Sequence, residues 1–207
     1  MSRVRIKICG ITRPEDALHA AAEGADAIGL VFHNDSPRVV TSERANAIAC
    51  ALPPFVARTG LFVDAEAAFV RSMLTSVPLD LLQFHGDEPP AYCRAFGRPY
   101  IKAIRMAEGV DLPGIAREYA DAAALLLDAH VPGSPGGTGR TFDWERVPVS
   151  LRTAVILAGG LTPQNVAEAI RRVRPWAVDV SGGVESAKGV KDPARVTAFI
   201  EAVRQAG

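Results

Sequence analysis

The stretch AIGLVF at residues 27–32 is apolar at every position, and VILA at residues 155–158 repeats this pattern nearer the end of the chain. A strand with one face in water alternates apolar and polar residues, whereas a strand covered on both faces is apolar throughout. Parallel sheets wrapped by helices contain strands of the second kind. The two stretches therefore predict an α/β fold built on a parallel sheet.

Similar apolar runs recur along the chain, each followed by a Gly, Asp or Pro break and by a helical stretch rich in Ala, Glu and Arg. We predict eight strands, near residues 4–9, 27–32, 57–63, 79–84, 100–105, 123–128, 154–158 and 177–181. We predict helices near residues 14–23, 41–51, 64–76, 88–96, 112–119, 143–147, 163–173 and 192–205. Eight βα units, each parallel to its neighbour through a right-handed crossover, predict a (βα)8 (TIM) barrel that forms one domain over residues 1–207.

A doubly wound open sheet is the alternative fold. It has fewer strands and usually a glycine-rich nucleotide loop after the first strand. Here the first strand is followed by GITRP at residues 10–14, which lacks that loop. We therefore favour the barrel.

Composition argues against several kinds of partner. The 23 basic and 23 acidic side chains give a formal net charge of zero, so we expect no binding to nucleic acid or to an anionic membrane surface. The three cysteines show no CxxC spacing, which favours free thiols in a reducing compartment. The start MSRVR runs directly into a strand, and no apolar run approaches the ~18 residues of a membrane span. We expect a cytoplasmic protein.

Side chains at the C-terminal ends of barrel strands gather at one mouth, where barrel enzymes carry out their chemistry. Cys9 ends the first predicted strand, and Asp128 ends the sixth. A thiolate can take a carbon-bound proton while a carboxyl group gives one, which is sufficient for an isomerisation without a cofactor. The alternatives are an inert core cysteine at position 9 and a carboxylate at position 128 that merely caps a turn.

Glycines follow the last two strands. Gly159 and Gly160 follow the seventh strand, and Ser181, Gly182 and Gly183 follow the eighth. Glycine lets backbone amides approach an anion closely, and many barrels bind a substrate phosphate at these two loops. The sequence therefore predicts a phosphate site there, although TP at residues 162–163 is also an ordinary helix start.

Two further strand ends carry polar side chains. Arg38 follows the second strand and could bind a carboxylate, and His85 follows the fourth and could contact a ligand. The alternatives are a solvated surface arginine at position 38 and a structural histidine at position 85. The segment GGTGRT at residues 136–141 lacks the spacing and lysine of a nucleotide-binding loop, and reads instead as part of an active-site loop over residues 129–140. The four histidines have no ligand spacing, so we predict no metal and no cofactor.

Six motifs together resemble the phosphoribosylanthranilate isomerase family of tryptophan biosynthesis. They occur in order from the first strand to the last: KICGIT at 7–12, SPR at 36–38, QFHG at 83–86, GGTGRTFDW at 136–144, LAGGL at 157–161 and DVSGGVE at 179–185. The resemblance therefore covers essentially the whole chain. One position departs from the family pattern, because Gly182 stands where a second serine is usual.

The resemblance implies an Amadori rearrangement of N-(5'-phosphoribosyl)anthranilate. Asp128 would protonate the furanose ring oxygen, and Cys9 would take the proton from C2 of the sugar. Arg38 would hold the anthranilate carboxylate, with His85 near that ring, and the glycine loops would bind the phosphate. The protein would be a monomer or a homodimer.

Strand alternation adds one expectation. If Cys9 points to the mouth, Lys7 points into the barrel one layer below, and a buried ammonium needs a partner. Asp179 on the neighbouring strand is the closest inward candidate, so we predict a buried, structural pair of Lys7 and Asp179.

Other functions remain open at this point. The chain could be another phosphosugar isomerase, such as ProFAR isomerase, but that relative looks to use a carboxylate at the position of Cys9. It could also be a non-catalytic phosphate-binding barrel, which the presence of both proton-handling residues disfavours.

Overall fold

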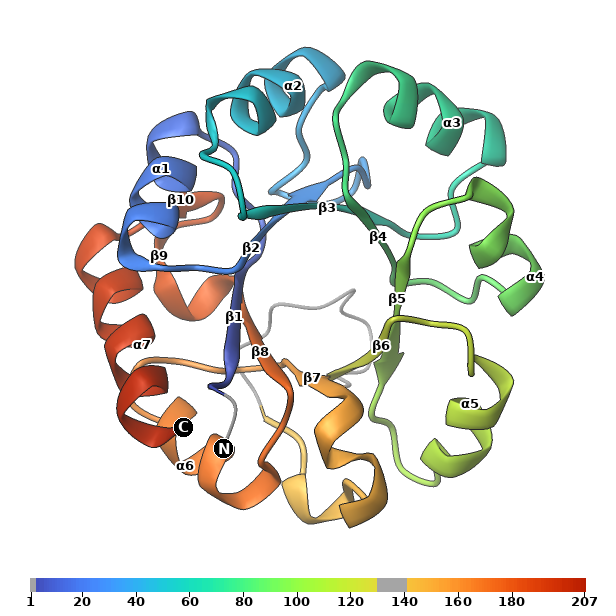
Figure 1. The fold of residues 1–207 in the computed structure, drawn as a ribbon, viewed down its shortest axis with the longest axis vertical. Helices are drawn as coiled ribbons and strands as arrows, with labels where there is room; N and C mark the ends of the chain where they lie inside the picture. The colour runs from blue at the N-terminus through green and yellow to red at the C-terminus, as the bar shows by residue number, and fades with distance from the viewer. Residues whose placement is uncertain (1–2, 130–140) are drawn as a thin grey trace.

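The computed structural model describes residues 3–129 and 141–207, and its strands close into a parallel barrel in the order in which they occur along the chain. Helices surround the ring of strands (Figure 1). The predicted (βα)8 barrel is thus confirmed. Its strands are β1 (Arg5–Ile8), β2 (Ala27–Val31), β3 (Ala57–Phe62), β4 (Leu81–Phe84), β5 (Tyr100–Arg105), β6 (Ala124–Asp128), β7 (Val155–Leu157) and β8 (Ala177–Val180).

The helices lie close to their predicted positions. They are α1 (Pro14–Glu23), α2 (Ser42–Ala51), α3 (Ala67–Ser76), α4 (Pro90–Cys93), α5 (Leu112–Glu118), α6 (Val166–Val173) and α7 (Pro193–Ala206). Prolines at the first positions of α1 and α7 suit helix starts, because the missing N–H has no partner within the helix there. None of the helices within residues 3–129 and 141–207 has the length and hydrophobicity needed to cross a bilayer.

Two predicted helices differ from the structure, and the segment after β8 contains elements that were not predicted. Residues 143–147 form a 3₁₀ turn, η2 (Trp144–Arg146), because Pro148 disfavours a helical conformation at the residue before it. Helix α6 begins at Val166 and not at residue 163, because residues 163–165 form a turn. After β8 the chain forms a short 3₁₀ segment, η4 (Gly182–Val184), and an unpredicted hairpin, β9 (Glu185–Ala187) with β10 (Val190–Lys191).

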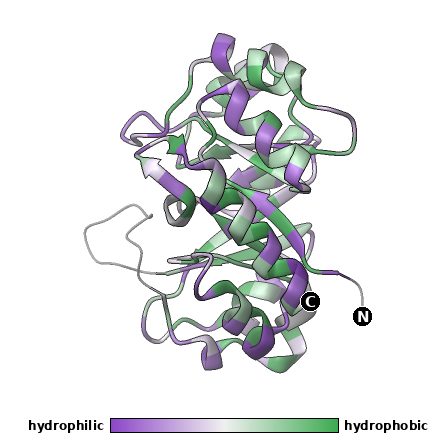
Figure 2. Ribbon diagram, turned by 90° about the vertical axis from the view of Figure 1, so that its left-hand side faces the viewer, coloured by the Kyte–Doolittle hydropathy of each residue, from purple (hydrophilic) through white to green (hydrophobic). Residues whose placement is uncertain are grey.

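Alternate strand residues pack into different layers. Leu125 and Leu127 belong to the large cluster between strands and helices, whereas Leu126 belongs to a second cluster made of strand residues inside the barrel. A third, smaller cluster contains Cys9 and lies at the mouth with Val31. Figure 2 shows that the helices around the strands carry both hydrophobic and hydrophilic residues, as helices with one face against a core do. Both faces of the sheet are therefore covered, as the apolar strands predict.

Candidate active site

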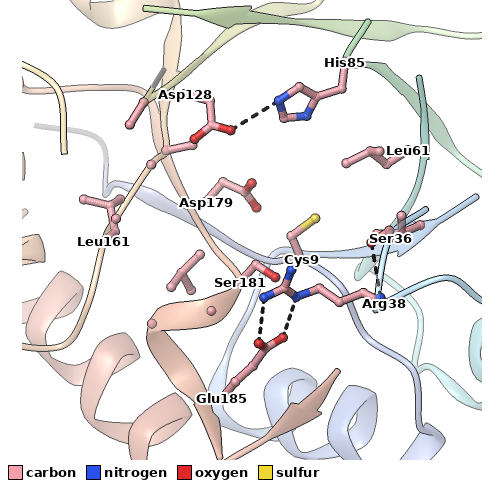
Figure 3. A pocket seen from close by; sticks show the side chains of 18 of the residues that line it. Cys9, Ser36, Arg38, Leu61, His85, Asp128, Leu161, Asp179, Ser181 and Glu185 are labelled. Carbon is pink, nitrogen blue, oxygen red and sulfur yellow. Dashed lines mark hydrogen bonds and ion pairs between the residues drawn. The ribbon is translucent and has the colours of Figure 1, made fainter. Parts of the chain in front are cut away.

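A pocket of about 700 Å³ opens at the C-terminal mouth of the barrel. Its lining includes every site residue predicted from the sequence: Cys9, Arg38, His85, Asp128, Gly159, Gly160, Ser181, Gly182 and Gly183. Figure 3 shows the side chains of Cys9 and Asp128 facing this pocket from different strands. The fold thus gathers residues up to 174 positions apart in the chain into one cavity.

Cys9 follows β1 directly. Its backbone amide donates a 2.8 Å hydrogen bond to the carbonyl of Val180, which fixes the position of its main chain beside β8. The thiol is buried against Val31 and Leu61. Gly29 on the neighbouring strand makes room for it, since a Cβ atom at Gly29 would lie 2.7 Å from the Cys9 sulfur. Burial raises the pKa of the Cys9 thiol, while the nearby Lys7 ammonium acts to lower it.

Lys7 and Asp179 form the predicted pair inside the barrel. The two residues are register partners on β1 and β8, and the Lys7 Nζ donates a 2.8 Å hydrogen bond to Asp179 Oδ1. Their side chains are only 5% and 9% exposed. Burial favours the neutral amine and is the largest single effect, but Asp179 and Cys9 together outweigh it and raise the pKa of Lys7 to about 12. The prediction that both side chains lie inside the barrel is therefore confirmed.

This pair gives a prediction for stability. Lys7→Met leaves the Asp179 carboxylate buried without its partner, and we expect the free energy of unfolding to fall by about 3–5 kcal/mol. The double variant Lys7→Met/Asp179→Leu removes both charges and is expected to recover most of that loss. Urea denaturation of the three proteins measures the difference. A double variant no more stable than Lys7→Met would contradict the electrostatic explanation.

Asp128 is the last residue of β6, and its carboxylate faces the ring of His85, which follows β4. His85 Nε2 lies 3.3 Å from Asp128 Oδ2, and the two side chains are 12% and 13% exposed. Figure 3 shows the two groups pointing toward one another at the edge of the pocket. Sequence reasoning placed both residues at the mouth but missed this contact, because strand position does not specify the direction of a side chain in a loop.

The two glycine loops pack tightly against their surroundings. Gly159 adopts φ of 80°, a left-handed conformation that favours glycine, and a Cβ atom there would lie 2.9 Å from Asp128 Oδ1. A Cβ atom at Gly183 would lie 1.9 Å from the carbonyl oxygen of Leu161 in the other loop. The side chain of Asn165 holds the first loop, since it donates to the carbonyl of Gly160. Glycine at these positions therefore permits close contact between the loops and leaves backbone exposed to the pocket.

One edge of the Arg38 guanidinium forms an ion pair with the carboxylate of Glu185. Glu185 is the first residue of the hairpin that was not predicted from the sequence. Its Nε and Nη2 donate hydrogen bonds of 2.7 and 2.8 Å to the two carboxylate oxygens. Lys191 donates a further bond of 2.9 Å to Glu185. Burial opposes ionisation of Glu185, but Arg38 and Lys191 hold the pKa of its carboxyl below the ordinary range. Periodicity could not identify this network, because a two-residue strand such as β10 has no detectable alternation.

The structure bears on the predicted active-site loop and on the predicted absence of a metal site in different ways. The predicted active-site loop at residues 129–140 lies outside the described residues except for Ala129, and so does most of the motif at 136–144. Within residues 3–129 and 141–207, no group of three or more His, Cys, Asp or Glu side chains is placed to hold a metal ion.

Comparison with known proteins agrees with this geometry. The family model described as N-(5'phosphoribosyl)anthranilate (PRA) isomerase matches residues 6–202. A curated relative from Nitrosococcus oceani, named N-(5'-phosphoribosyl)anthranilate isomerase, is 61% identical over 201 residues, which cover 97% of this chain and 98% of the relative.

Solved structures give the same result. A crystal structure of phosphoribosyl anthranilate isomerase from Thermotoga maritima matches with a TM-score of 0.89 at 40% identity, over 98% of this chain and 99% of that one. A structure of the same enzyme type in complex with reduced 1-(o-carboxyphenylamino)-1-deoxyribulose 5-phosphate matches with a TM-score of 0.86 at 39% identity, over 98% and 99% of the two chains. The chain therefore belongs to the N-(5'-phosphoribosyl)anthranilate isomerase family.

Proposed function

We propose that this protein rearranges N-(5'-phosphoribosyl)anthranilate to 1-(2-carboxyphenylamino)-1-deoxyribulose 5-phosphate in tryptophan biosynthesis, with Asp128 as general acid and Cys9 as general base. The observation that carries the proposal is that these two groups face one pocket from β1 and β6. Family membership supports the overall reaction. The roles of the two residues rest on the chemistry that their positions permit.

The reaction needs one proton given and one proton taken. Asp128 gives its proton to the furanose ring oxygen, the bond from that oxygen to C1 breaks, and the nitrogen lone pair forms an iminium with C1. The Cys9 thiolate then takes the proton from C2, and the C–H electrons form a C1–C2 double bond while the iminium electrons return to nitrogen. The resulting enolamine becomes the ketone when its hydroxyl proton moves to C1. The substrate's own iminium thus serves as the electron sink.

The substrate phosphate is assigned to the two glycine loops. Gly159 and Gly160 contribute backbone from one side, and Ser181, Gly182 and Gly183 from the other. Backbone amides bind an anion without needing a side chain, so glycine in place of the usual serine at position 182 removes a hydroxyl but keeps the amide. A related protein was solved in complex with a phosphate-bearing product analogue. The similarity of its fold to that of this chain supports the assignment of the phosphate to these loops.

The anthranilate carboxylate is assigned to Arg38. A guanidinium has five N–H groups, and Glu185 accepts from Nε and from one N–H of Nη2. The remaining N–H groups, on Nη1 and on the other side of Nη2, form a second edge that matches a carboxylate. Glu185 therefore orients Arg38 and leaves one edge for the substrate.

The protonation state of Cys9 is open to a direct test. Burial raises the pKa of the Cys9 thiol, Asp179 adds to that rise, and Lys7 and Lys191 oppose it. We expect Asp179→Asn to lower the pKa of Cys9 and Lys7→Met to raise it. The rate of iodoacetamide alkylation against pH, measured in a Cys50→Ser background because Cys50 is exposed, reports that pKa. Equal alkylation profiles in all three proteins would contradict the assigned electrostatics.

The activity itself is tested by the fluorescence change when freshly made phosphoribosylanthranilate is consumed. We expect turnover of this substrate and none of ProFAR. Turnover of ProFAR would favour the second isomerase, and binding of phosphate esters without turnover would favour a non-catalytic barrel.

A further inference from the structure

We propose that Gln83 and His85 determine which oxygen of Asp128 carries the catalytic proton, an inference that rests on the proposed role of Asp128 as the general acid. A carboxylic acid carries its proton on one oxygen, and catalysis requires that this oxygen face the substrate. Gln83 is the last but one residue of β4, and His85 follows that strand directly. The three side chains line the same pocket.

The side chain of Gln83 selects the tautomer of the His85 ring. The amide Nε2 of Gln83 lies 3.2 Å from His85 Nδ1, and an amide nitrogen can only donate. Nδ1 is therefore the acceptor, and a neutral imidazole with an acceptor at Nδ1 carries its hydrogen on Nε2. Gln83 is fully buried, so water does not compete for this contact.

The His85 ring in turn faces one oxygen of the Asp128 carboxyl group. His85 Nε2 is buried and has no hydrogen-bond partner of good geometry in the described part of the chain, yet it lies 3.3 Å from Asp128 Oδ2. With its hydrogen on Nε2, His85 can only donate to Oδ2. When Asp128 is protonated, a carbonyl oxygen accepts this bond better than a hydroxyl oxygen does, so the contact favours Oδ2 as the carbonyl oxygen and places the proton on Oδ1. Catalytic hydrogen bonds are often long in the ligand-free protein and tighten when the substrate binds.

Oδ1 is the oxygen of Asp128 that lies beside the glycine loop after β7. A Cβ atom at Gly159 would lie 2.9 Å from Oδ1 and 2.3 Å from the amide nitrogen of Ala129, so any side chain at position 159 would crowd this oxygen. As Asp128 loses its proton, the bond from His85 becomes charge-assisted and stronger. His85 therefore stabilises the transition state more than the ground state.

The backbone around His85 is held from two sides, which keeps the ring in place. Arg105 donates a 3.1 Å hydrogen bond to the carbonyl of His85. The next residue, Gly86, donates from its amide to Glu88 and accepts at its carbonyl from Lys102, and Glu88 and Lys102 form a buried ion pair of 2.8 Å. His85 is thus a positioning residue that acts through Asp128.

The tautomer of His85 tests the inference without reference to activity. In the full-length protein labelled with ¹⁵N-histidine, we expect the His85 nitrogen shifts of a neutral ring protonated at Nε2. A ring protonated at Nδ1 would overturn the proposal. His19, which contacts the carbonyl of Pro193 away from the pocket, provides an internal reference, and its signal is assigned with the variant His19→Asn.

Kinetics separate the proposal from a simple contact with the substrate. His85→Asn removes the donor near Asp128, and we expect kcat to fall about a hundred-fold with KM nearly unchanged. His85→Gln can place an amide donor near the Nε2 position and should recover part of that loss. A rise in KM with unchanged kcat would overturn the proposal and indicate a contact with the anthranilate ring. Unchanged activity in Asp128→Asn would instead contradict the proposed function, so the two failures are distinguishable.

Discussion

Replacing Cys9 with serine is expected to lower kcat by about a hundred-fold to ten-thousand-fold, the usual contribution of a positioned general base. A hydroxyl is close in size to a thiol but far less acidic, so the variant keeps the packing against Val31 and Leu61 and loses the base. Steady-state turnover of phosphoribosylanthranilate measures the effect. KM is expected to change little, because Cys9 is assigned no binding role.

The chain offers a matched control for this change. Cys50→Ser replaces an exposed thiol on α2, outside the pocket, and is expected to leave kcat unchanged. Equal turnover by Cys9→Ser and the parent protein would reject Cys9 as the base.

Replacing Asp128 with asparagine is expected to produce a loss of similar size. The amide keeps the shape of the side chain but has no proton to give to the ring oxygen, so opening of the furanose becomes the slow step. We expect kcat to fall at least about a hundred-fold while the melting temperature changes little. Single-turnover experiments at saturating protein measure the ring-opening step directly.

Asp80→Asn is the control for the loss of a carboxylate. Asp80 precedes β4 at the opposite end of the barrel, where it pairs with Arg58. We expect full activity from this variant. Undiminished activity in Asp128→Asn would remove the acid from the proposed mechanism.

The barrel could be predicted because its strands are apolar throughout and are separated by clear breaks. Strand order also places Cys9, Asp128 and the glycine loops at one mouth, and alternation along β1 was enough to predict that Lys7 meets Asp179. The two-residue period of a strand fixes which face each side chain occupies, so such inferences require no coordinates.

Contacts made by loops could not be predicted in the same way. The pairing of His85 with Asp128 and of Arg38 with Glu185 depends on side-chain directions in segments without a repeating period. The hairpin that carries Glu185 and Lys191 was missed because its strands are only three and two residues long. The predicted helix at residues 143–147 was wrong in type because Pro148 limits it to one turn.

The pairing of acid and base is tested most directly by a crystal structure of this protein with bound reduced 1-(o-carboxyphenylamino)-1-deoxyribulose 5-phosphate. We predict that the Cys9 sulfur lies within about 4 Å of sugar C2, and that Asp128 lies about 3 Å from the oxygen at C4 that closes the ring in the substrate. The phosphate should lie between the two glycine loops. A reversed orientation, with C2 beside Asp128 and the C4 oxygen beside Cys9, would contradict the assignment.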